Sequence, residues 1–335
     1  MTEAFDCGSS AVLLMAYGGP DCLEAVGPFM CDLTGREPGP EMLARVQARY
    51  ASIGGKSPLP EIAQGFAGAL EASLARGGCS VPVAVGFKYT HPKIGDVLAG
   101  LHERGIRSVV GVSLSPFESK STSTAYEGAV SEALPGLPGM RVEYAPALGE
   151  LPEFAAAHAV ALAEALGRVR ASRSETLVVF TAHSLPVADL ETPERYITGL
   201  RRVASHLAEE AGWSRGTDFA ASELLGDIAS FGALEGDSPW MLAYQSKGMR
   251  PGEWLGPDLA DVMAAAAAAG IKAVVVSPIG FATEHMETRY DLDVVEADRA
   301  SGLGIEFARG AAPNSHPALV GAVSSAVVRA MGHRE

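Results

Sequence analysis

Short apolar runs alternate with longer amphipathic segments along most of this chain. The runs that predict buried strands are residues 11–16, 81–87, 108–114, 142–144, 176–180, 240–243, 271–276 and 304–307. The segments with helical periodicity between and after them are residues 41–50, 61–76, 92–104, 153–169, 193–210, 258–269 and 317–331. Nearly continuous apolar strands that alternate with helices are typical of parallel sheets covered on both faces. Because the pattern occurs twice, the sequence predicts an α/β protein of two similar doubly wound, Rossmann-like domains that face one another across a cleft.

The expected domain boundary lies near residue 150, and a length of 335 residues is enough for two separate cores. We expect an N-terminal domain over residues 1–150 and a C-terminal domain over residues 151–314, with a last helix over 315–333 that packs back on the first domain. The polar link over 212–239 is longer than usual and is either an insertion, with an extra helix over 220–228, or a lid.

Polar side chains follow the predicted strands in both halves. Tyr17, Lys88, His183, Gln245 and Glu287 all lie at or just beyond the carboxyl ends of these strands. Open α/β sheets bind their ligands at that edge. The sequence therefore predicts one shared site.

An acidic stretch follows the strand at 271–276. Glu284, Glu287 and Asp291 are separated by three and then four residues, so a helix would place the three carboxylates on one stripe. Arg289 is the only lysine or arginine in this stretch that offsets their negative charge. Such a stripe is either a solvated helix face or a path for a cation or for protons, which would relieve the repulsion between like charges.

The overall charge limits the partners of this protein. A formal net charge of −14 argues against nucleic acid and anionic membranes, both of which select basic surfaces. The polar, acidic start MTEAFDCGSS does not resemble a signal peptide, and no apolar run is long enough to span a bilayer. We expect a cytoplasmic protein without integral membrane contact. Its four cysteines, Cys7, Cys22, Cys31 and Cys79, form no C-x-x-C pair and are best explained as reduced thiols.

Two common nucleotide-binding motifs are missing. Gly55-Lys56-Ser57 resembles the end of a P-loop, but Tyr50 replaces its first glycine, and neither half opens with a dinucleotide fingerprint. His183 follows a buried strand, and Ser184 beside it lacks a nucleophile elbow. This histidine is therefore either a structural hydrogen-bond partner or a proton acceptor or metal ligand.

Several sequence blocks together resemble one known family. They are LLMAYGGP (13–20), GREPGPEM (35–42), RYASIGGKSPL (49–59), TAHSLP (181–186), YQSKGMRPGEWLGPDL (244–259) and PIGFATEHMETRYDLD (278–293). In this order they are similar to the ferrochelatases, which have a class II chelatase fold. The chain looks most like the soluble coproporphyrin ferrochelatases, because Tyr17 follows the first strand.

The resemblance implies an enzyme that inserts Fe(II) into coproporphyrin III in haem biosynthesis. It implies that His183 takes the pyrrole protons or first contacts the metal, that Glu287 stands opposite, and that Asp291 continues the path. It assigns iron contacts to these three residues and to Tyr17. The porphyrin contacts that it implies are Tyr17, Arg36, Arg49, Ser57, Lys88, Tyr126, Gln245 and Ser246. Iron is a substrate in this interpretation, no tightly bound cofactor or iron–sulfur cluster is expected, and transient partners from the haem pathway are conceivable.

Two departures and two alternatives stay open. The segment Asp32-Leu33-Thr34 before Gly35-Arg36 lacks the paired arginines that some members of the family have. Val295 replaces a carboxylate that often continues the acidic stripe in the family, although Glu296 is adjacent. The first alternative is a chelatase for another metal or tetrapyrrole. The second is a non-catalytic haem- or porphyrin-binding protein on the same fold, for which the acidic stripe would have no use.

Overall fold

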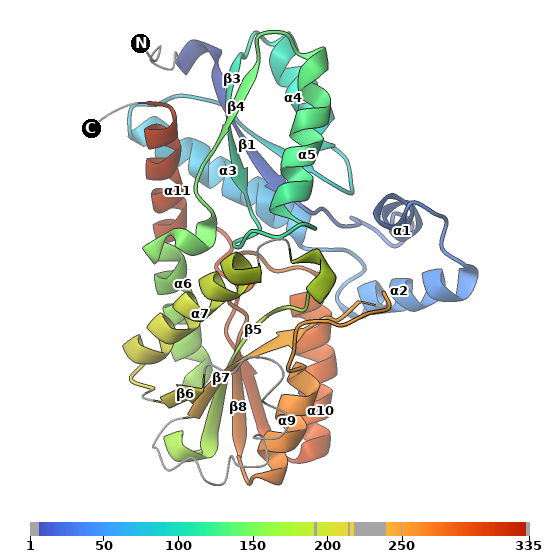
Figure 1. Cartoon of the computed structure of the whole chain (residues 1–335), viewed down its shortest axis with the longest axis vertical. Helices are drawn as coiled ribbons and strands as arrows, with labels where there is room; N and C mark the ends of the chain where they lie inside the picture. Colours follow the sequence, from blue (N-terminus) through green and yellow to red (C-terminus); the bar gives the residue numbers. More distant parts are fainter. Residues whose placement is uncertain (1–6, 191–192, 214, 218–238, 249, 333–335) are drawn as a thin grey trace. The chain divides into compact units, whose positions relative to one another are not determined.

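The computed structural model describes residues 7–190, 193–213, 215–217, 239–248 and 250–332, and these residues form two compact units (Figure 1). The first unit takes in the chain up to Glu153, the short stretch Ala282–Met286 and the C-terminal part from Asn314. The second takes in Phe154–Phe281 and Glu287–Pro313. The expectation that the two halves face one another across a cleft stays a prediction.

The first unit is built on a four-stranded sheet in the order β2-β1-β3-β4. Its strands are β1 (Ser10–Ala16), β2 (Val83–Phe87), β3 (Ser108–Ser113) and β4 (Arg141–Tyr144). All pairs are parallel, and Val12 of β1 lies beside Val83 on one side and Val110 on the other. The central strand β1 is buried along its whole length, which is why it consists almost entirely of apolar residues.

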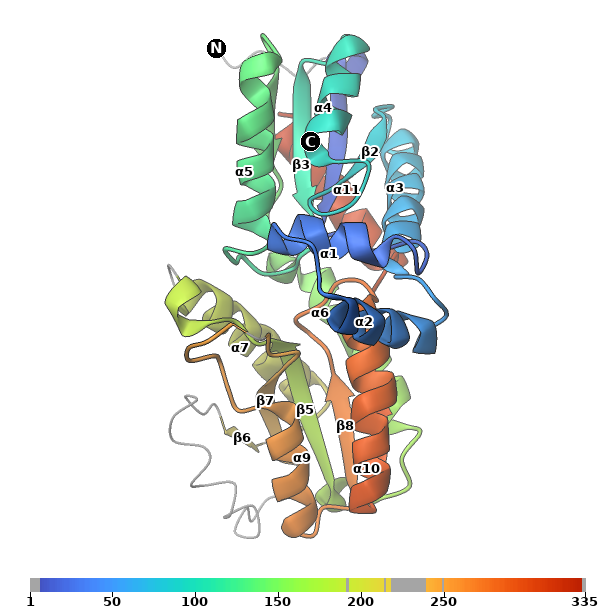
Figure 2. The ribbon, with the colours of Figure 1, turned by 90° about the vertical axis from the view of Figure 1, so that its right-hand side faces the viewer.

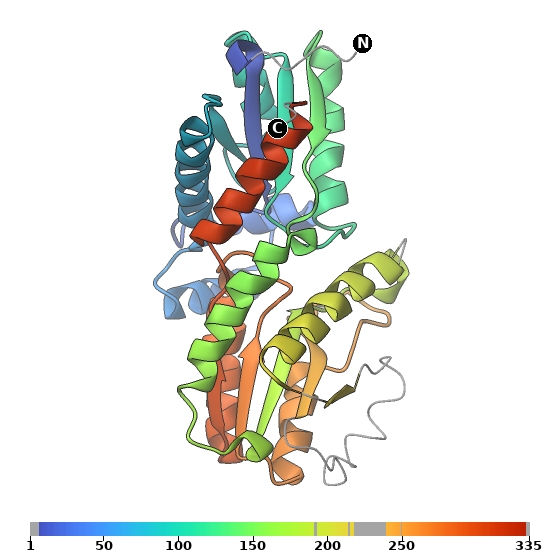
Figure 3. The same cartoon turned by 90° about the vertical axis from the view of Figure 1, so that its left-hand side faces the viewer.

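Helices cover both faces of this sheet (Figures 2 and 3). The helices of this unit are α1 (Val26–Thr34), α2 (Pro40–Ser52), α3 (Leu59–Arg76), α4 (Ile94–Glu103), α5 (Ser123–Ala133) and α11 (Pro317–Ala330). On one face, Leu13 and Met15 of β1 pack with Leu98 of α4 and with Tyr126 of α5. On the other face, α11 lies against α3. The sequence pattern did not predict α1 or α5.

The second unit contains a parallel sheet in the order β6-β7-β5-β8-β9 within the described residues. Its strands are β5 (Thr176–His183), β6 (Arg215–Thr217), β7 (Pro239–Gln245), β8 (Ala273–Ser277) and β9 (Glu306–Arg309). Four of these strands were predicted. The fifth, β6, is only three residues long, which is too short for a recognisable strand pattern. The helix predicted over 220–228 lies outside the described residues.

The helices of the second unit are α6 (Pro152–Leu166), α7 (Pro193–Glu210), α9 (Leu259–Ala268), a π-helix (Glu287–Glu296) and α10 (Ala297–Leu303). Val179 of β5 shares one buried cluster with Leu259 of α9, Leu292 of the π-helix and Ala300 of α10. Helices α6 and α7 lie on the opposite face (Figure 3). Short 3-10 turns lie at Cys7–Ser9, Leu134–Gly136, Leu148–Glu150, Arg173–Glu175 and Val187–Asp189. Both sheets are thus parallel and doubly wound, which confirms the predicted fold class. No helix in the described part of the chain is apolar over a stretch sufficient to cross a bilayer.

A glycine secures the close approach of two chain segments behind the end of β5. The Gly280 N–H donates to Thr181 O at 2.9 Å, and a Cβ atom on Gly280 would lie 2.5 Å from Ala182 Cα. Gly280→Ala is therefore expected to lower the free energy of unfolding by about 2 kcal/mol, because backbone would have to move. The matched control is Gly302→Ala, where an added Cβ meets nothing within 4 Å and alanine favours the helix. Urea unfolding of both variants checks this, and equal stability would contradict it.

Candidate functional site

His183 is the last residue of β5 and lies beside Gln245 of β7 in the parallel ladder. The next N–H, that of Ser184, donates to Gln245 O at 2.8 Å. His183 Nδ1 contacts Ser184 O, and because a carbonyl can only accept, Nδ1 carries a proton and donates it. Nε2 is then the ring nitrogen that is left for chemistry.

Nε2 of His183 lies 3.1 Å from Oε1 of Glu287, the first residue of the π-helix. Burial by itself lowers the pKa of His183, but the charge of Glu287 and the hydrogen bonds to Glu287 and to Ser184 O outweigh it, so the pKa is raised above its ordinary value. Both ring nitrogens thus face acceptors. This arrangement favours the charged imidazolium of His183 over its neutral form.

Gln245, the last residue of β7, and Ser246 after it form hydrogen bonds to the π-helix through their side chains. Thr181 Oγ1 donates to Gln245 Oε1 at 2.8 Å, which turns the Gln245 amide nitrogen toward Glu287 O at 3.2 Å. Ser246 has a φ of 59°, a left-handed conformation that is uncommon for a residue other than glycine. In that conformation its hydroxyl donates to Asp291 Oδ2. These two residues, predicted as porphyrin contacts, therefore hold the start of the π-helix, and their porphyrin contacts stay predictions.

The acidic stretch forms a different helix from the predicted one. It is a π-helix of ten residues, with i→i+5 hydrogen bonds, a rare form that is frequent at functional sites. Glu284 lies outside it, and its N–H donates to Asn314 Oδ1 at 2.9 Å. The prediction of one stripe with Glu284, Glu287 and Asp291 is therefore wrong for Glu284. Its spacing of three residues suits an α-helix, but the chain has not yet become helical at that point.

Glu296 ends the π-helix and is almost completely buried. Burial raises its pKa, and the ion pair with Arg299 at 2.8 Å only partly offsets this. Within the described ranges, no three side chains of histidine, cysteine, aspartate or glutamate are arranged as a preformed metal site. To bind a metal ion, Glu287 would therefore have to give up its contact with His183, or Asp291 its hydrogen bond with Ser246.

In the first unit, Tyr17 follows β1 and packs against Tyr89, with ring centroids 4.6 Å apart. The Tyr89 N–H donates to Tyr17 O at 3.0 Å, so the two strand ends stay paired beyond the sheet. A Cβ atom on Gly18 would lie 2.4 Å from Thr90 Oγ1, and one on Gly19 would lie 2.6 Å from the Ser57 side chain. The glycines after Tyr17 are thus required by close packing. Tyr89 was not predicted, since one tyrosine in a loop gives no signal in the sequence.

Ser57 and Tyr126 are buried in the first unit. Ser57 begins the approach to α3: its N–H donates to Pro20 O at 2.7 Å and its hydroxyl accepts from the Leu59 N–H at 3.3 Å. The Tyr126 hydroxyl lies 3.1 Å from Ser115 Oγ, and burial raises the pKa of Tyr126 far above its ordinary value. Both hydroxyls therefore have partners within their own unit.

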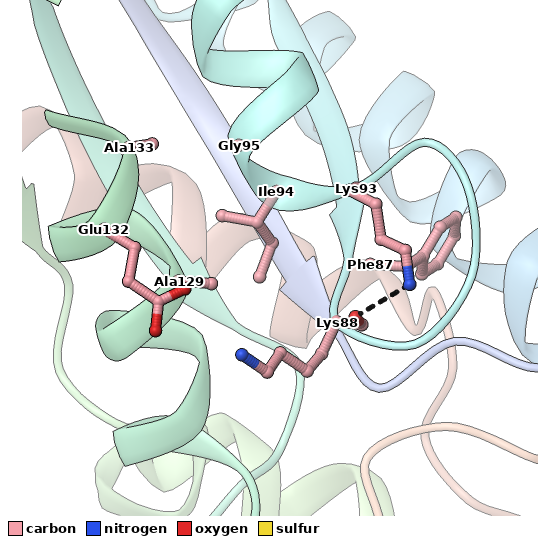
Figure 4. Close-up of a pocket in the computed structure, with 8 residues that line it drawn as sticks. All are labelled: Phe87, Lys88, Lys93, Ile94, Gly95, Ala129, Glu132 and Ala133. Atoms are coloured by element: carbon pink, nitrogen blue, oxygen red, sulfur yellow. Dashed lines mark hydrogen bonds between the residues drawn. The ribbon is translucent and has the colours of Figure 1, made fainter. Parts of the chain in front are cut away.

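Of the predicted basic residues, Arg36 and Arg49 are exposed, after α1 and in the last turn of α2. Lys88 lines a pocket of about 310 Å³ between the end of β2 and the helices α4 and α5 (Figure 4). Lys93, not predicted, enters the same pocket, donates to Lys88 O at 3.3 Å and pairs with Asp32. The other lining residues are Phe87, Ile94, Gly95, Ala129, Glu132 and Ala133.

The fold thus consists of two doubly wound parallel α/β units, and one of them holds a histidine–carboxylate pair at the end of its central strand. The solved structure of SirB from Bacillus subtilis with Fe3+ has this fold, with a TM-score of 0.53 and 13% sequence identity over 96% of this chain and 95% of that one. At this identity the likeness concerns the fold alone.

The chain belongs to the ferrochelatase family, which it matches over residues 9–331. A ferrochelatase of Herpetosiphon aurantiacus is 32% identical to it, over 95% of this chain and 98% of the relative. A coproporphyrin III ferrochelatase of Propionibacterium freudenreichii is 31% identical, over 96% of this chain and 87% of the relative. The resemblance in the sequence blocks is thereby confirmed. The protein is an enzyme, and its family inserts a metal ion into a porphyrin.

Proposed function

We propose that this enzyme inserts Fe(II) into coproporphyrin III. The observation that carries the proposal is the contact of 3.1 Å between His183 Nε2 and Glu287 Oε1. During insertion two pyrrole N–H bonds break and iron–nitrogen bonds form, so two protons must be taken up near the ring. A histidine and a carboxylate that share one proton can release it and take up another without large rearrangement.

The next group along the path of protons or metal is Asp291, four residues after Glu287 on the π-helix. Its carboxylate accepts a hydrogen bond from Ser246, and its charge contributes to the raised pKa of His183. Asp291 thus acts on the pair electrostatically and offers a hard oxygen donor for incoming Fe(II). The reaction requires no resident cofactor, because iron is a substrate.

The choice of porphyrin is supported by two features. The relative in Propionibacterium freudenreichii is a coproporphyrin III ferrochelatase. The chain also has a tyrosine after its first strand and several cations in the same unit, among them Arg36, Arg49 and Lys88. Cations favour a substrate with four carboxylates over one with two. With a net charge of −14, we further place the enzyme in the cytoplasm rather than on an anionic membrane.

An anaerobic assay tests the proposal. The purified protein is mixed with Fe(II) and either coproporphyrin III or protoporphyrin IX, and the absorbance of the metallated product is followed. We expect faster turnover with coproporphyrin III. Parallel assays with Co(II) and Ni(II) test the alternative of another metal, and tight porphyrin binding without turnover with any metal would favour a carrier.

Asp291→Asn is expected to raise the KM for Fe(II) severalfold and to lower kcat less than a substitution of Glu287. The amide can still accept from Ser246, but it lacks the charge that attracts the cation. Asp298→Asn is the matched control, because Asp298 is exposed on α10. Initial rates at varied Fe(II) check this, and a loss of kcat larger than that of Glu287→Gln would contradict it.

Tyr17→Phe is expected to change the absorption spectrum of the bound ferric product and to leave Fe(II) insertion largely intact. A phenolate is a hard donor that suits Fe(III), while phenylalanine keeps the ring contact with Tyr89. Tyr144→Phe, at a tyrosine 40% exposed on β4, is the control. An unchanged ferric spectrum in Tyr17→Phe would remove Tyr17 from the metal ligands.

A further inference from the structure

The carbonyl group of His183 lies where the sheet no longer supplies a donor. In the parallel ladder, Gln245 O accepts from Ser184 N, so the N–H and C=O of His183 itself point to the side of β8. The pairing of β5 with β8 ends at Phe180 and Ser277. Beyond it Gly280 N still donates to Thr181 O, and among the described residues no further backbone bond follows on this side of β5.

The chain after β8 then turns away. Pro278 has no N–H, and the Phe281 N–H donates to Pro278 O at 3.1 Å, which closes a turn. The His183 carbonyl instead accepts from the Tyr196 hydroxyl, at 3.0 Å. A side-chain hydroxyl thus supplies the hydrogen bond that a neighbouring strand would otherwise supply.

Tyr196 is suited to this contact by its position. It lies in the first turns of α7 and is 6% exposed. Burial, and then the nearby Tyr244 and Glu287, raise its pKa well above the ordinary value, so the phenol keeps its proton throughout the working range. Because that one proton is directed to the His183 carbonyl, Tyr196 is not a proton acceptor in the reaction.

The two contacts hold one peptide group at both ends. The group between His183 and Ser184 has its N–H bound to Gln245 O at 2.8 Å and its C=O bound to Tyr196 at 3.0 Å. The following carbonyl, that of Ser184, accepts from His183 Nδ1, while the Ser184 hydroxyl donates to Leu255 O at 2.7 Å. The orientation of this peptide therefore sets the direction of the imidazole.

We propose that Tyr196 is a positioning residue for metal insertion, and that its hydroxyl fixes the His183–Ser184 peptide so that Nε2 meets Glu287. The inference rests on the proposed role of His183 as proton acceptor. It assigns a function to a residue that the sequence does not distinguish from other tyrosines on amphipathic helices. In this proposal Tyr196 acts through His183, whose carbonyl accepts from its hydroxyl.

Tyr196→Phe tests this, since it keeps the buried ring and removes only the hydroxyl. We expect kcat for iron insertion to fall about tenfold, because small displacements of catalytic groups have such effects. The KM values for Fe(II) and porphyrin should stay within about twofold. At constant pH, the ¹⁵N resonances of the His183 ring should shift or broaden, as the ring loses its single orientation. Tyr144→Phe is the control for loss of a tyrosine hydroxyl elsewhere and should match the natural protein.

A double-mutant cycle separates this inference from the proposed function. If Tyr196 acts through His183, Tyr196→Phe should cost nothing further in the His183→Ala background. If His183→Ala itself retains full activity, the proposed function fails. If His183→Ala is inactive but Tyr196→Phe keeps its kcat and its His183 resonances, only the inference fails. Thermal unfolding and hydrogen exchange of the Ser184 amide complete the set. A fall in kcat that merely parallels the loss of folded protein would also overturn the inference.

Discussion

His183→Ala is expected to lower kcat for iron insertion by about 10²–10⁴-fold while porphyrin binding stays intact. The substitution removes the ring that shares a proton with Glu287, and with it the nearest acceptor for a pyrrole proton. Backbone contacts of the strand end, such as Ser184 N to Gln245 O, do not depend on the imidazole. The fold should therefore be retained.

Stopped-flow measurement of metallation, together with porphyrin titration by fluorescence quenching, checks this result. His206→Ala is a suitable control, because His206 lies on α7 and pairs only weakly with Glu210 at 3.8 Å. Turnover close to that of the natural protein in His183→Ala would remove the histidine from the mechanism. A parallel loss of porphyrin affinity would instead make His183 a binding residue.

Glu287→Gln is expected to cause a loss of kcat of similar size, with little change in porphyrin affinity. The amide keeps the shape of the side chain but can neither take a proton nor carry the charge that faces His183. The substitution would remove the Glu287 charge, which is the main influence that raises the pKa of His183, while the burial that lowers this pKa would remain. The pKa of His183 should therefore fall, and ¹H–¹⁵N titration of the imidazole measures the fall directly.

The direction of the pKa shift also fixes the pH dependence. A histidine that must accept a proton is blocked in its charged form, so activity should rise with pH through the raised pKa of His183, above 6.5. In Glu287→Gln this acid limb should move to lower pH. In the natural protein the charged pair stabilises the fold below the unfolded pKa, and this contribution is lost as pH rises through the folded-state pKa.

Glu164→Gln, at an exposed position on α6, controls for the removal of a carboxylate elsewhere. Unchanged turnover in Glu287→Gln would contradict the role of the pair. An upward shift of the His183 pKa would contradict its electrostatic explanation, because it would require a different group to hold the proton.

The sequence by itself determined the fold class and the place of the main chemical groups. Apolar runs such as residues 11–16 and 176–180 predict strands buried on both faces, and burial of this kind depends mainly on local composition. His183 and Gln245 could be assigned to strand ends because parallel strands place their carboxyl ends at one edge. The family was recognisable from blocks of residues that occur in a fixed order, and this recognition did not depend on predicting the fold.

Only the tertiary structure decided which partners these groups have. The π-helix could not be read from Glu287 and Asp291, since i→i+5 bonding arises from how the whole segment packs and leaves no periodic signal. The role of Tyr196 could not be predicted from the sequence for a similar reason. Its hydroxyl matters because β8 turns away at Pro278 and leaves the His183 carbonyl without a strand donor. Hydrogen bonds between residues distant in sequence follow from the path of the chain in space, so residue type and spacing alone do not specify them.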